Sequence, residues 1–394
     1  MFGFVVILFS YFLSAFIRVS PTIVMPIYQQ IFGLTPSAVG LIAGIFFIPY
    51  GFMQMFAGPL CQKYGLYRIS AIGQLLAAIG LLLFAFAKNA LMLFIGRFLI
   101  GAGMGPVFIT VMAYVQKHFS GPKYALVFGI AVMISNVGAA LSAYPLQYLL
   151  TKFGVSSVFI ILCVLTVIIM LYLWIKSLNE ERDNSVTGIV SGSLSCFKSI
   201  IKNYRLRCCL CAWILQSITL NSYQALWSTK WTSLAFPNMA SVAGLGATAI
   251  SIGIIIGSPI SERLHHKINN SIDRLLSAFG FVIVSLTTLI LSKSLFFAVS
   301  LVADFVYGIA AGDNCTQMAS FIREESDSNT AATITGMYNG LGCFSCQLFQ
   351  WGSGAVIGAW TIGTNPILPY ATSFAIPAIA MVFVYLYAKR IKAR

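Results

Sequence analysis

Charged side chains are scarce in this chain. Asp, Glu, Lys and Arg together make up 9% of the residues, whereas soluble domains carry roughly 25%. This leaves too little polar surface to cover a globule that faces water, and 59% of the residues are hydrophobic. The apolar residues form runs of about 20 rather than short alternating strands, which argues against an outer-membrane barrel. The composition predicts a polytopic helical membrane protein.

Side-chain sets for chemistry are also missing. The chain has 3 His and 9 Cys. Cys343 and Cys346 form a C-x-x-C pair, but it lies in an apolar segment with no His nearby, which indicates helix packing rather than metal binding. No cysteine falls in a predicted outer loop, so no disulfide is expected. Because no nucleophile–base set or phosphate-binding loop appears either, we expect neither an enzyme nor a bound metal or cofactor.

Acidic residues are outnumbered by basic ones, 10 to 24. Most of the basic residues fall in connections on one side of the predicted spans, and the opposite side receives Lys88, Lys152, Lys230 and Lys293. This asymmetry is the positive-inside bias that orients membrane proteins, and it predicts that both termini are cytoplasmic. The net charge of +14 therefore needs no nucleic-acid partner.

Twelve apolar segments can be drawn along the chain. Their approximate ranges are 4–26, 38–60, 69–87, 90–115, 123–147, 155–176, 208–229, 240–261, 274–292, 295–320, 329–357 and 367–388. The connection between the sixth and the seventh is long, polar and charged. It predicts an N-terminal six-helix bundle over residues 1–176, a central cytoplasmic loop over 177–207 and a C-terminal six-helix bundle over 208–394. We expect a monomer.

The two halves share a short pattern in their fourth helices. "RFLIGAGMG", from Arg97 to Gly105, aligns without a gap with "DFVYGIAAG", from Asp304 to Gly312. The two stretches share a phenylalanine and two glycines, and Arg97 falls opposite Asp304. Paired six-span halves with a binding site between them are a common transporter plan.

The loop after the second span, "GPLCQKYGLYR", and the repeat together resemble the major facilitator superfamily, and the resemblance covers the whole chain. The positions of the family's gating signature and its C-terminal copy are Gly58, Gln62, Lys63, Gly65, Arg68, Glu262 and Arg263. Gln62 replaces the usual acid, whereas Glu262 keeps it in the second half. In the family this acid latches the outward-facing state, so the resemblance implies that Glu262 carries more of the latch here.

The resemblance also implies two pseudo-symmetric six-helix bundles in a multi-pass protein of the cell membrane, most simply a bacterial inner membrane. The fifth span lacks the glycine–proline signature of drug/proton antiporters. The stretches "FIRVSPTIVMPIY" and "FIPYGFMQMFAGPL" are more similar to uptake permeases for organic anions, amino acids and related metabolites.

Four charged residues interrupt the apolar segments: Arg18, Arg97, Asp304 and Asp313. A charge at mid-helix costs ~2.5–3.5 kcal/mol, so each needs a cavity or a partner. Tyr11, Ser14, Arg18 and Thr22 share one face of the first span, which the resemblance places along a central cavity. We predict that Arg18 is an anion-binding donor, because a guanidinium suits a carboxylate or phosphate. The alternative is that Arg18 snorkels to the outer surface.

The seventh span carries a comparable polar stripe that includes Asn221 and Gln224, with Tyr223 beside it. Arg97 and Asp304 form either a direct ion pair or a pair that a proton or an anion breaks. Asp313 lies nine residues beyond Asp304, so an ideal helix turns it to the opposite face. Asp304 and Asp313 are the proton-coupling candidates, with Asp304 as the cavity acid and Asp313 in packing or gating. The substrate-binding candidates are Tyr11, Ser14, Arg18, Thr22, Arg97, Asn221, Tyr223 and Gln224.

These features predict a secondary active transporter that works by alternating access, with proton-coupled symport of a small organic anion or zwitterion such as a carboxylate or amino acid. Its partners are the substrate, protons and the lipid bilayer. Two alternatives stay open. One is efflux of amphipathic drugs in exchange for protons, and the other is a non-transporting membrane receptor or scaffold.

Overall fold

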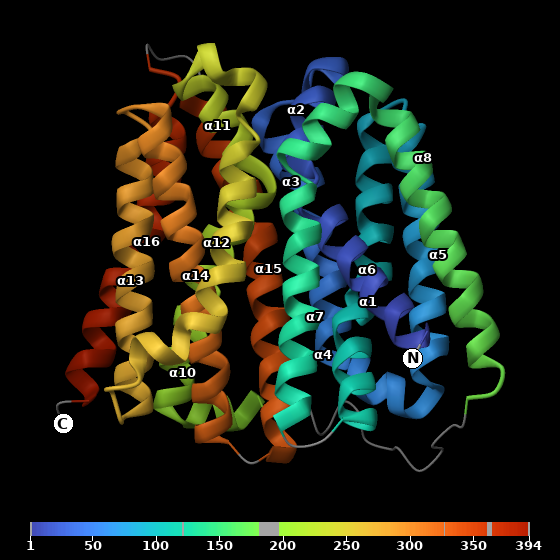
Figure 1. The fold of residues 1–394 in the computed structure, drawn as a ribbon. Coiled ribbons are helices and arrows are strands. Elements are labelled where there is room, and N and C mark those ends of the chain that lie inside the picture. Colours follow the sequence, from blue (N-terminus) through green and yellow to red (C-terminus); the bar gives the residue numbers. More distant parts are fainter. Residues whose placement is uncertain (1, 120–121, 181–196, 327, 361–364, 393–394) are drawn as a thin grey trace.

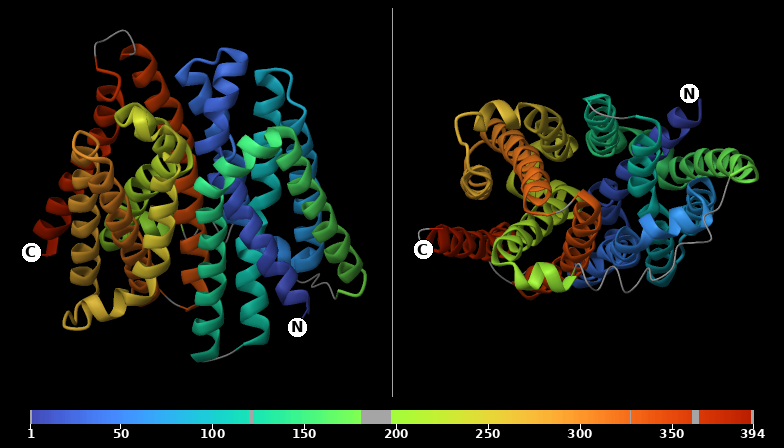
Figure 2. Two further views of the ribbon diagram at one scale, coloured as in Figure 1. Left: turned by 45° about the horizontal axis from the view of Figure 1, so that its top comes forward. Right: turned by 90° about the horizontal axis from the view of Figure 1, so that it is seen from below.

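The computed structural model describes the chain except residues 1, 120–121, 181–196, 327, 361–364 and 393–394. The described residues form helices and no strand. The helices of the first half of the chain lie beside those of the second half, both from the side (Figure 1) and from below (Figure 2). The predicted all-helical fold of two bundles is confirmed.

The first bundle contains bent helices. Its elements are α1 (Phe2–Val19), α2 (Pro21–Phe32), α3 (Pro36–Gly44), α4 (Phe47–Tyr64), α5 (Leu66–Ala85), α6 (Ala90–His118), α7 (Pro122–Leu141) and α8 (Tyr144–Ser177). α1 and α2 meet at 43° and together make the first predicted span. Proline at position 21 cannot donate the backbone hydrogen bond that would continue α1. α7 meets the start of α8 at 47°, and Gly154, with φ +76°, divides α8 between the fifth and sixth predicted spans.

The second bundle begins with an interrupted helix. α10 (Tyr204–Ser222) passes through a π-helical turn, η1 (Tyr223–Trp227), into α11 (Ser228–Ala235). The remaining elements are the 3-10 helix η2 (Pro237–Val242), α12 (Leu245–His265), α13 (Ser271–Ser292), α14 (Phe297–Glu325), α15 (Ser328–Trp360) and α16 (Leu368–Lys392). Each of the twelve predicted segments overlaps at least one of these helices, although segments such as 69–87 and 295–320 extend past the helix ends and segment 38–60 crosses the break between α3 and α4.

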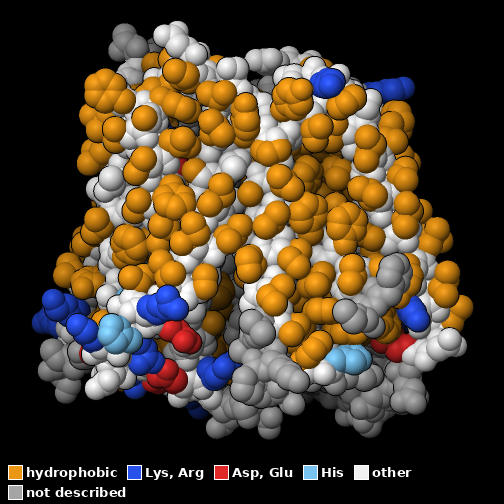
Figure 3. All heavy atoms as spheres, in the orientation of Figure 1, with side chains coloured by type: hydrophobic (Ala, Val, Ile, Leu, Met, Phe, Trp, Pro, Cys, Tyr) orange, Lys and Arg blue, Asp and Glu red, His pale blue; other side chains and the backbone are white. Residues whose placement is uncertain are grey.

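The surface shows how the protein sits in a membrane. Among the described residues, seven helices are long and apolar enough to span a bilayer, or up to nine if each bent pair counts as one span. α10, α14 and α15 are not among them. Hydrophobic side chains cover most of the face in Figure 3, and charged ones gather at its lower end. This distribution agrees with the positive-inside orientation, in which the lower end is cytoplasmic.

Several helix pairs join the bundles. α15 packs along α3 and α4, and α7 packs against α12. Small residues make this approach close, as membrane helix pairs require: a Cβ on Gly40 of α3 would lie 2.0 Å from the backbone oxygen of Gln350 in α15. The domain boundaries at 176 and 208 stay a prediction, because residues 181–196 of the central loop lie outside the described residues.

Candidate functional site

Arg18 lies between the two bundles. Its Nη1 donates a hydrogen bond of 2.5 Å to Oδ1 of Asn221 in α10, and its side chain is half-buried. Asn221 in turn donates from Nδ2 to the backbone oxygen of Ser217, at 3.0 Å. The amide of Asn221 is thereby oriented with its oxygen toward the guanidinium. This contact directs Arg18 toward the opposite bundle rather than toward headgroups.

The surroundings of Arg18 are polar but lack an acid. The side chains of Tyr11 and Tyr50 lie near it, as does that of Cys343 of α15. Among the described residues, no carboxylate lies within ion-pair distance of Arg18. Side chains of α1, α4, α10 and α15 therefore surround a positive charge without a carboxylate partner among the described residues.

The other residues of the first-span stripe have different neighbours. Ser14 is buried. Thr22 is fully buried, and its Oγ1 lies 3.0 Å from Oγ1 of Thr229 in α11. Because α2 bends away from α1 at Pro21, Thr22 joins the two bundles above Arg18 instead of lining one wall with it. A uniform helical wheel cannot show this bend.

The predicted stripe on the seventh span is broken by the π-helical turn. A π turn places one extra residue in the helix, so the side chains after it are rotated relative to a regular α-helix. Gln224 donates to Oγ of Ser251 in α12 at 2.8 Å, inside the second bundle. Tyr223 is fully buried and also points into that bundle. Of this stripe's three candidates, Asn221 is the one that contacts Arg18.

Asp304 has partners that the sequence did not suggest. It accepts a hydrogen bond of 2.7 Å from the hydroxyl of Tyr223 and lies 3.2 Å from Nζ of Lys293, the residue that follows α13. Nζ also donates to Oγ1 of Thr232 at 3.0 Å. Asp304 and Lys293 are 1% and 2% exposed. From the sequence, Lys293 was expected at the outer surface. The sequence signal for its pairing with Asp304 is a lysine at the end of one span, followed in the next span by an intramembrane acid without an evident partner.

Arg97 is held by backbone carbonyls. Its Nη1 and Nη2 donate to the backbone oxygens of Ile17 and Ala43, each at 3.2 Å, and its guanidinium lies 4.7 Å from the ring centroid of Phe46. The carbonyl of Ile17 is the one that Pro21 leaves without an intrahelical donor, and Ala43 lies in the last turn of α3. The predicted ion pair of Arg97 with Asp304 is therefore wrong. At 2% exposure, Arg97 stabilises helix ends.

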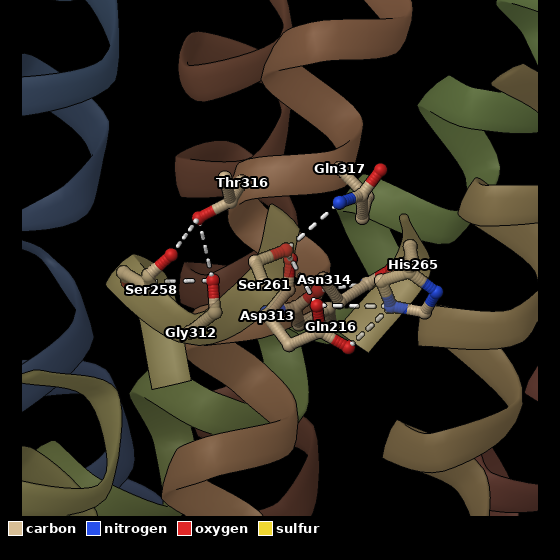
Figure 4. A network of polar contacts seen from close by, with 9 residues as sticks. All are labelled: Gln216, Ser258, Ser261, His265, Gly312, Asp313, Asn314, Thr316 and Gln317. Carbon is tan, nitrogen blue, oxygen red and sulfur yellow. Dashed lines mark hydrogen bonds and ion pairs between the residues drawn. The ribbon is translucent and has the colours of Figure 1, made fainter. Parts of the chain in front are cut away.

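Asp313 belongs to a separate polar network in the lower part of the second bundle (Figure 4). It accepts a hydrogen bond of 2.6 Å from Ser261 and lies 3.0 Å from Nε2 of His265, both in α12. Next to it, Asn314 donates to Gln216 of α10. Asp304 and Asp313 have separate polar partners, but both lie against α12, because a Cβ on Gly246 of that helix would be 2.6 Å from Oδ2 of Asp304. The opposite faces predicted from their spacing are not observed. His265 was not among the residues predicted from the sequence; its four-residue spacing from Ser261 places both on one face of α12.

In the first half, an acid from outside the gating signature, Glu180, contacts the signature residues. The carboxylate of Glu180, just after α8, accepts hydrogen bonds from the backbone amides of Leu66 and Tyr67 at 2.6 and 2.9 Å, and from Arg68 at 3.4 Å. It caps the N-terminus of α5, where a negative charge is favourable. Gly65 allows the carboxylate of Glu180 to approach the first amides of α5. Its φ is +94°, and a Cβ there would lie 2.4 Å from Oε2 of Glu180.

The remaining gating residues have varied positions. Glu262 and Arg263 are exposed, and Nζ of Lys63 lies 5.5 Å from the ring centroid of Tyr64. Gly58 lies in α4, but its surroundings and the side chain of Gln62 lie outside the described residues. The latch role expected for Glu262 stays a prediction. Within the described ranges, no cluster of His, Cys, Asp and Glu could hold a metal ion.

Comparison with known proteins places this geometry in a family. A family model described as Major Facilitator Superfamily matches residues 7–350. One relative is the "Probable sulfoacetate transporter SauU" of Cupriavidus necator, 26% identical over 39% of this chain and 35% of that protein. Another is the L-fucose-proton symporter of Escherichia coli, 27% identical over 52% of this chain and 53% of that protein. The chain spans about a third to a half of the length of these curated relatives.

The fold is similar to that of a solved transporter structure over the whole chain. The crystal structure of the nucleoside transporter NupG is similar with a TM-score of 0.77 and 16% identity, covering 100% of both chains. At that identity the likeness shows the fold alone. Together with the family match across residues 7–350, it leads to one conclusion: this chain is a multi-pass membrane protein that belongs to the Major Facilitator Superfamily of transporters.

Proposed function

We propose that the protein is a proton-coupled symporter of a small organic anion, working by alternating access in the cell membrane. The observation that carries the proposal is the guanidinium of Arg18, which lies between the bundles without a carboxylate partner among the described residues. A charge in a span is costly, and an anionic substrate would compensate it each time it binds. The relative named for sulfoacetate, a small dianion, supports this substrate class.

The contact between Arg18 and Asn221 suggests how the anion enters. Asn221 supplies a neutral oxygen to the guanidinium, and a carboxylate or sulfonate makes stronger, charge-assisted hydrogen bonds to it. An incoming anion therefore displaces the amide. Because Arg18 and Asn221 belong to opposite bundles, this exchange changes a contact between the halves that must move against each other.

Proton coupling is assigned to Asp304 and Lys293. The pair ties α13 and α14 to the π-helical turn, because Asp304 also binds Tyr223. Tyr223 follows Asn221 by two residues on the same span. A proton on Asp304 removes the charge that holds Lys293 and weakens the attachment of this turn. The L-fucose-proton symporter among the relatives supports proton coupling. We expect a monomer in a bacterial inner membrane.

Uptake into proteoliposomes tests the proposal. Labelled sulfoacetate and a panel of small carboxylates are offered with the outside acidic, and L-fucose serves as an uncharged control. We expect accumulation of an anion that a protonophore abolishes. Arg18→Ala should lower uptake by about 10- to 100-fold, the loss expected for charge-assisted hydrogen bonds, while Arg18→Lys retains part of it. Uptake of L-fucose but of no anion, or unchanged uptake by Arg18→Ala, would contradict the proposal.

A further inference from the structure

A pocket opens between the bundles at the end of the molecule opposite to the charged lower end seen in Figure 3. It has a volume of about 360 Å³. Its walls come from α2 and α8 of the first bundle and from α11 and η2 of the second. Under the positive-inside orientation this is the outer end of the protein. The pocket is separate from the surroundings of Arg18, which do not contribute to its lining.

Several residues that line the pocket also form hydrogen bonds between the two bundles. Thr229, which lines the pocket, meets Thr22 through their hydroxyls at 3.0 Å. Gln147 donates to the backbone oxygen of Ala240 at 3.2 Å and accepts from the backbone amide of Gly244 at 3.1 Å. These contacts must break when the bundles part at the outer end. The pocket would then open toward Arg18, which precedes Thr22 on the same span.

The lining has the chemistry of an anion site. Lys230 is the single charged residue among those that line the pocket. It is half-buried, and its ammonium makes no ion pair within the described part of the chain. The side chains of Gln30, Thr151 and Ser233 add neutral hydrogen-bonding groups, and Ile23, Pro26 and Leu150 supply apolar wall. The hydroxyls of Thr151 and Ser233 donate to backbone oxygens, so the amide of Gln30 is the neutral donor beside Lys230. One cation beside an amide donor favours a small anion over a cation or a neutral solute.

We propose that this pocket is an outer vestibule that binds the organic anion before the bundles open, with Lys230 as its recruiting charge. The inference rests on the proposed function and adds to it a second binding site on the substrate's path. A cation at the mouth of a low-dielectric cleft raises the local concentration of anions and speeds their association. Lys230 should therefore affect how readily substrate is captured and leave the later steps of the cycle unchanged.

A labelling experiment tests the vestibule without any transport. Ser233→Cys is exposed from the outside to anionic sulfonatoethyl and cationic trimethylammonioethyl methanethiosulfonate, with the parent chain as background. We expect the anionic reagent to be favoured, and Lys230→Met to reduce the anionic-to-cationic rate ratio by about fivefold. Lys230→Arg should preserve the ratio. Lys152→Met is the matched control, because it removes a lysine next to Thr151 that does not line the pocket.

The KM of anion uptake provides a second test of the role of Lys230. Lys230→Met should raise KM for the anion by about fivefold at low ionic strength with an unchanged maximal rate, and Lys152→Met should behave as the parent. An unchanged labelling ratio in Lys230→Met overturns the vestibule, whatever the protein transports. A reduced ratio in a protein that takes up no anion upholds the vestibule and contradicts the proposed function instead.

Discussion

Each of the intramembrane charges is stabilised in a different way. The two Nη atoms of Arg97 donate to carbonyls at helix ends, while its Nε has no partner. Asp304 contacts a lysine and a tyrosine, and Asp313 a serine and a histidine. Arg18 has a neutral amide oxygen. Both arginines have neutral partners only, but Arg97 is 2% exposed whereas Arg18 is half-buried between the bundles. Arg18 is therefore the one of these two cations that an anionic ligand can reach, with a gain in charge compensation.

The pair of Lys293 and Asp304 gives a prediction at this scale. Breaking a buried ion pair by removing one partner costs about 3–5 kcal/mol, whereas replacing both partners by neutral groups is often tolerated. Lys293→Met and Asp304→Asn should each lower the thermal stability of the purified protein, and the double variant should recover most of it. The double variant should also exchange substrate across the membrane without responding to a proton gradient. Proton-driven accumulation by it would contradict the assignment of Asp304.

At the scale of elements, the interruptions of the helices position the site. The bend between α1 and α2 separates Thr22 from Arg18, and the π-helical turn directs Tyr223 into the second bundle while Asn221 faces the first. Proline at position 21 makes the bend readable from the sequence. No residue type marks the π turn in a comparable way, because it depends on the packing around it. Regular periodicity therefore predicted the helices well but misplaced Gln224 and Tyr223.

The cap of α5 by Glu180 gives a prediction for an element end. Glu180→Ala leaves the first amides of α5 without their acceptor and should cost about 0.5–2 kcal/mol of stability. Gly65→Ala should cost at least as much, because its Cβ would meet the carboxylate at 2.4 Å and its φ of +94° is unfavourable for alanine. Thermal unfolding in detergent measures both. Glu262→Gln, at an exposed position, is the control and should change stability by less than about 0.5 kcal/mol; an equal loss in the control would refute the cap.

At the scale of the whole molecule, the sequence predicted the architecture better than the site. Hydrophobic runs and the basic asymmetry are local properties of the chain, and they identified the helices and the orientation that agrees with Figure 3. The partners of Asp304 depend on how α13, α14 and η1 pack together. Sequence symmetry placed Arg97 opposite Asp304, but each residue pairs within its own bundle. The sequence pattern did bring Arg18 and Asn221 to the same region, because each lies on a polar stripe of a span expected to line the cavity. Their direct contact depends on how the two bundles pack.

Rocking of the bundles predicts the behaviour of a cross-link. Thr22 and Thr229 have their hydroxyl oxygens 3.0 Å apart at the outer contact, close enough for sulfurs in their place to be oxidised to a disulfide. The double variant Thr22→Cys and Thr229→Cys should lose transport on oxidation and regain it on reduction. Each single variant should be insensitive to oxidant. Full transport by the oxidised double variant would show that the outer ends need not part.

The central claim is that the guanidinium of Arg18 holds the substrate anion between the bundles. Equilibrium binding of labelled sulfoacetate and small carboxylates to the purified protein tests it most directly, because neither orientation nor coupling affects the result. We predict saturable binding of at least one anion, weakened about 10- to 100-fold in Arg18→Ala, less in Arg18→Lys, and unchanged in the control Lys152→Met. Anion binding of equal strength in the parent protein and in a folded Arg18→Ala variant would contradict it.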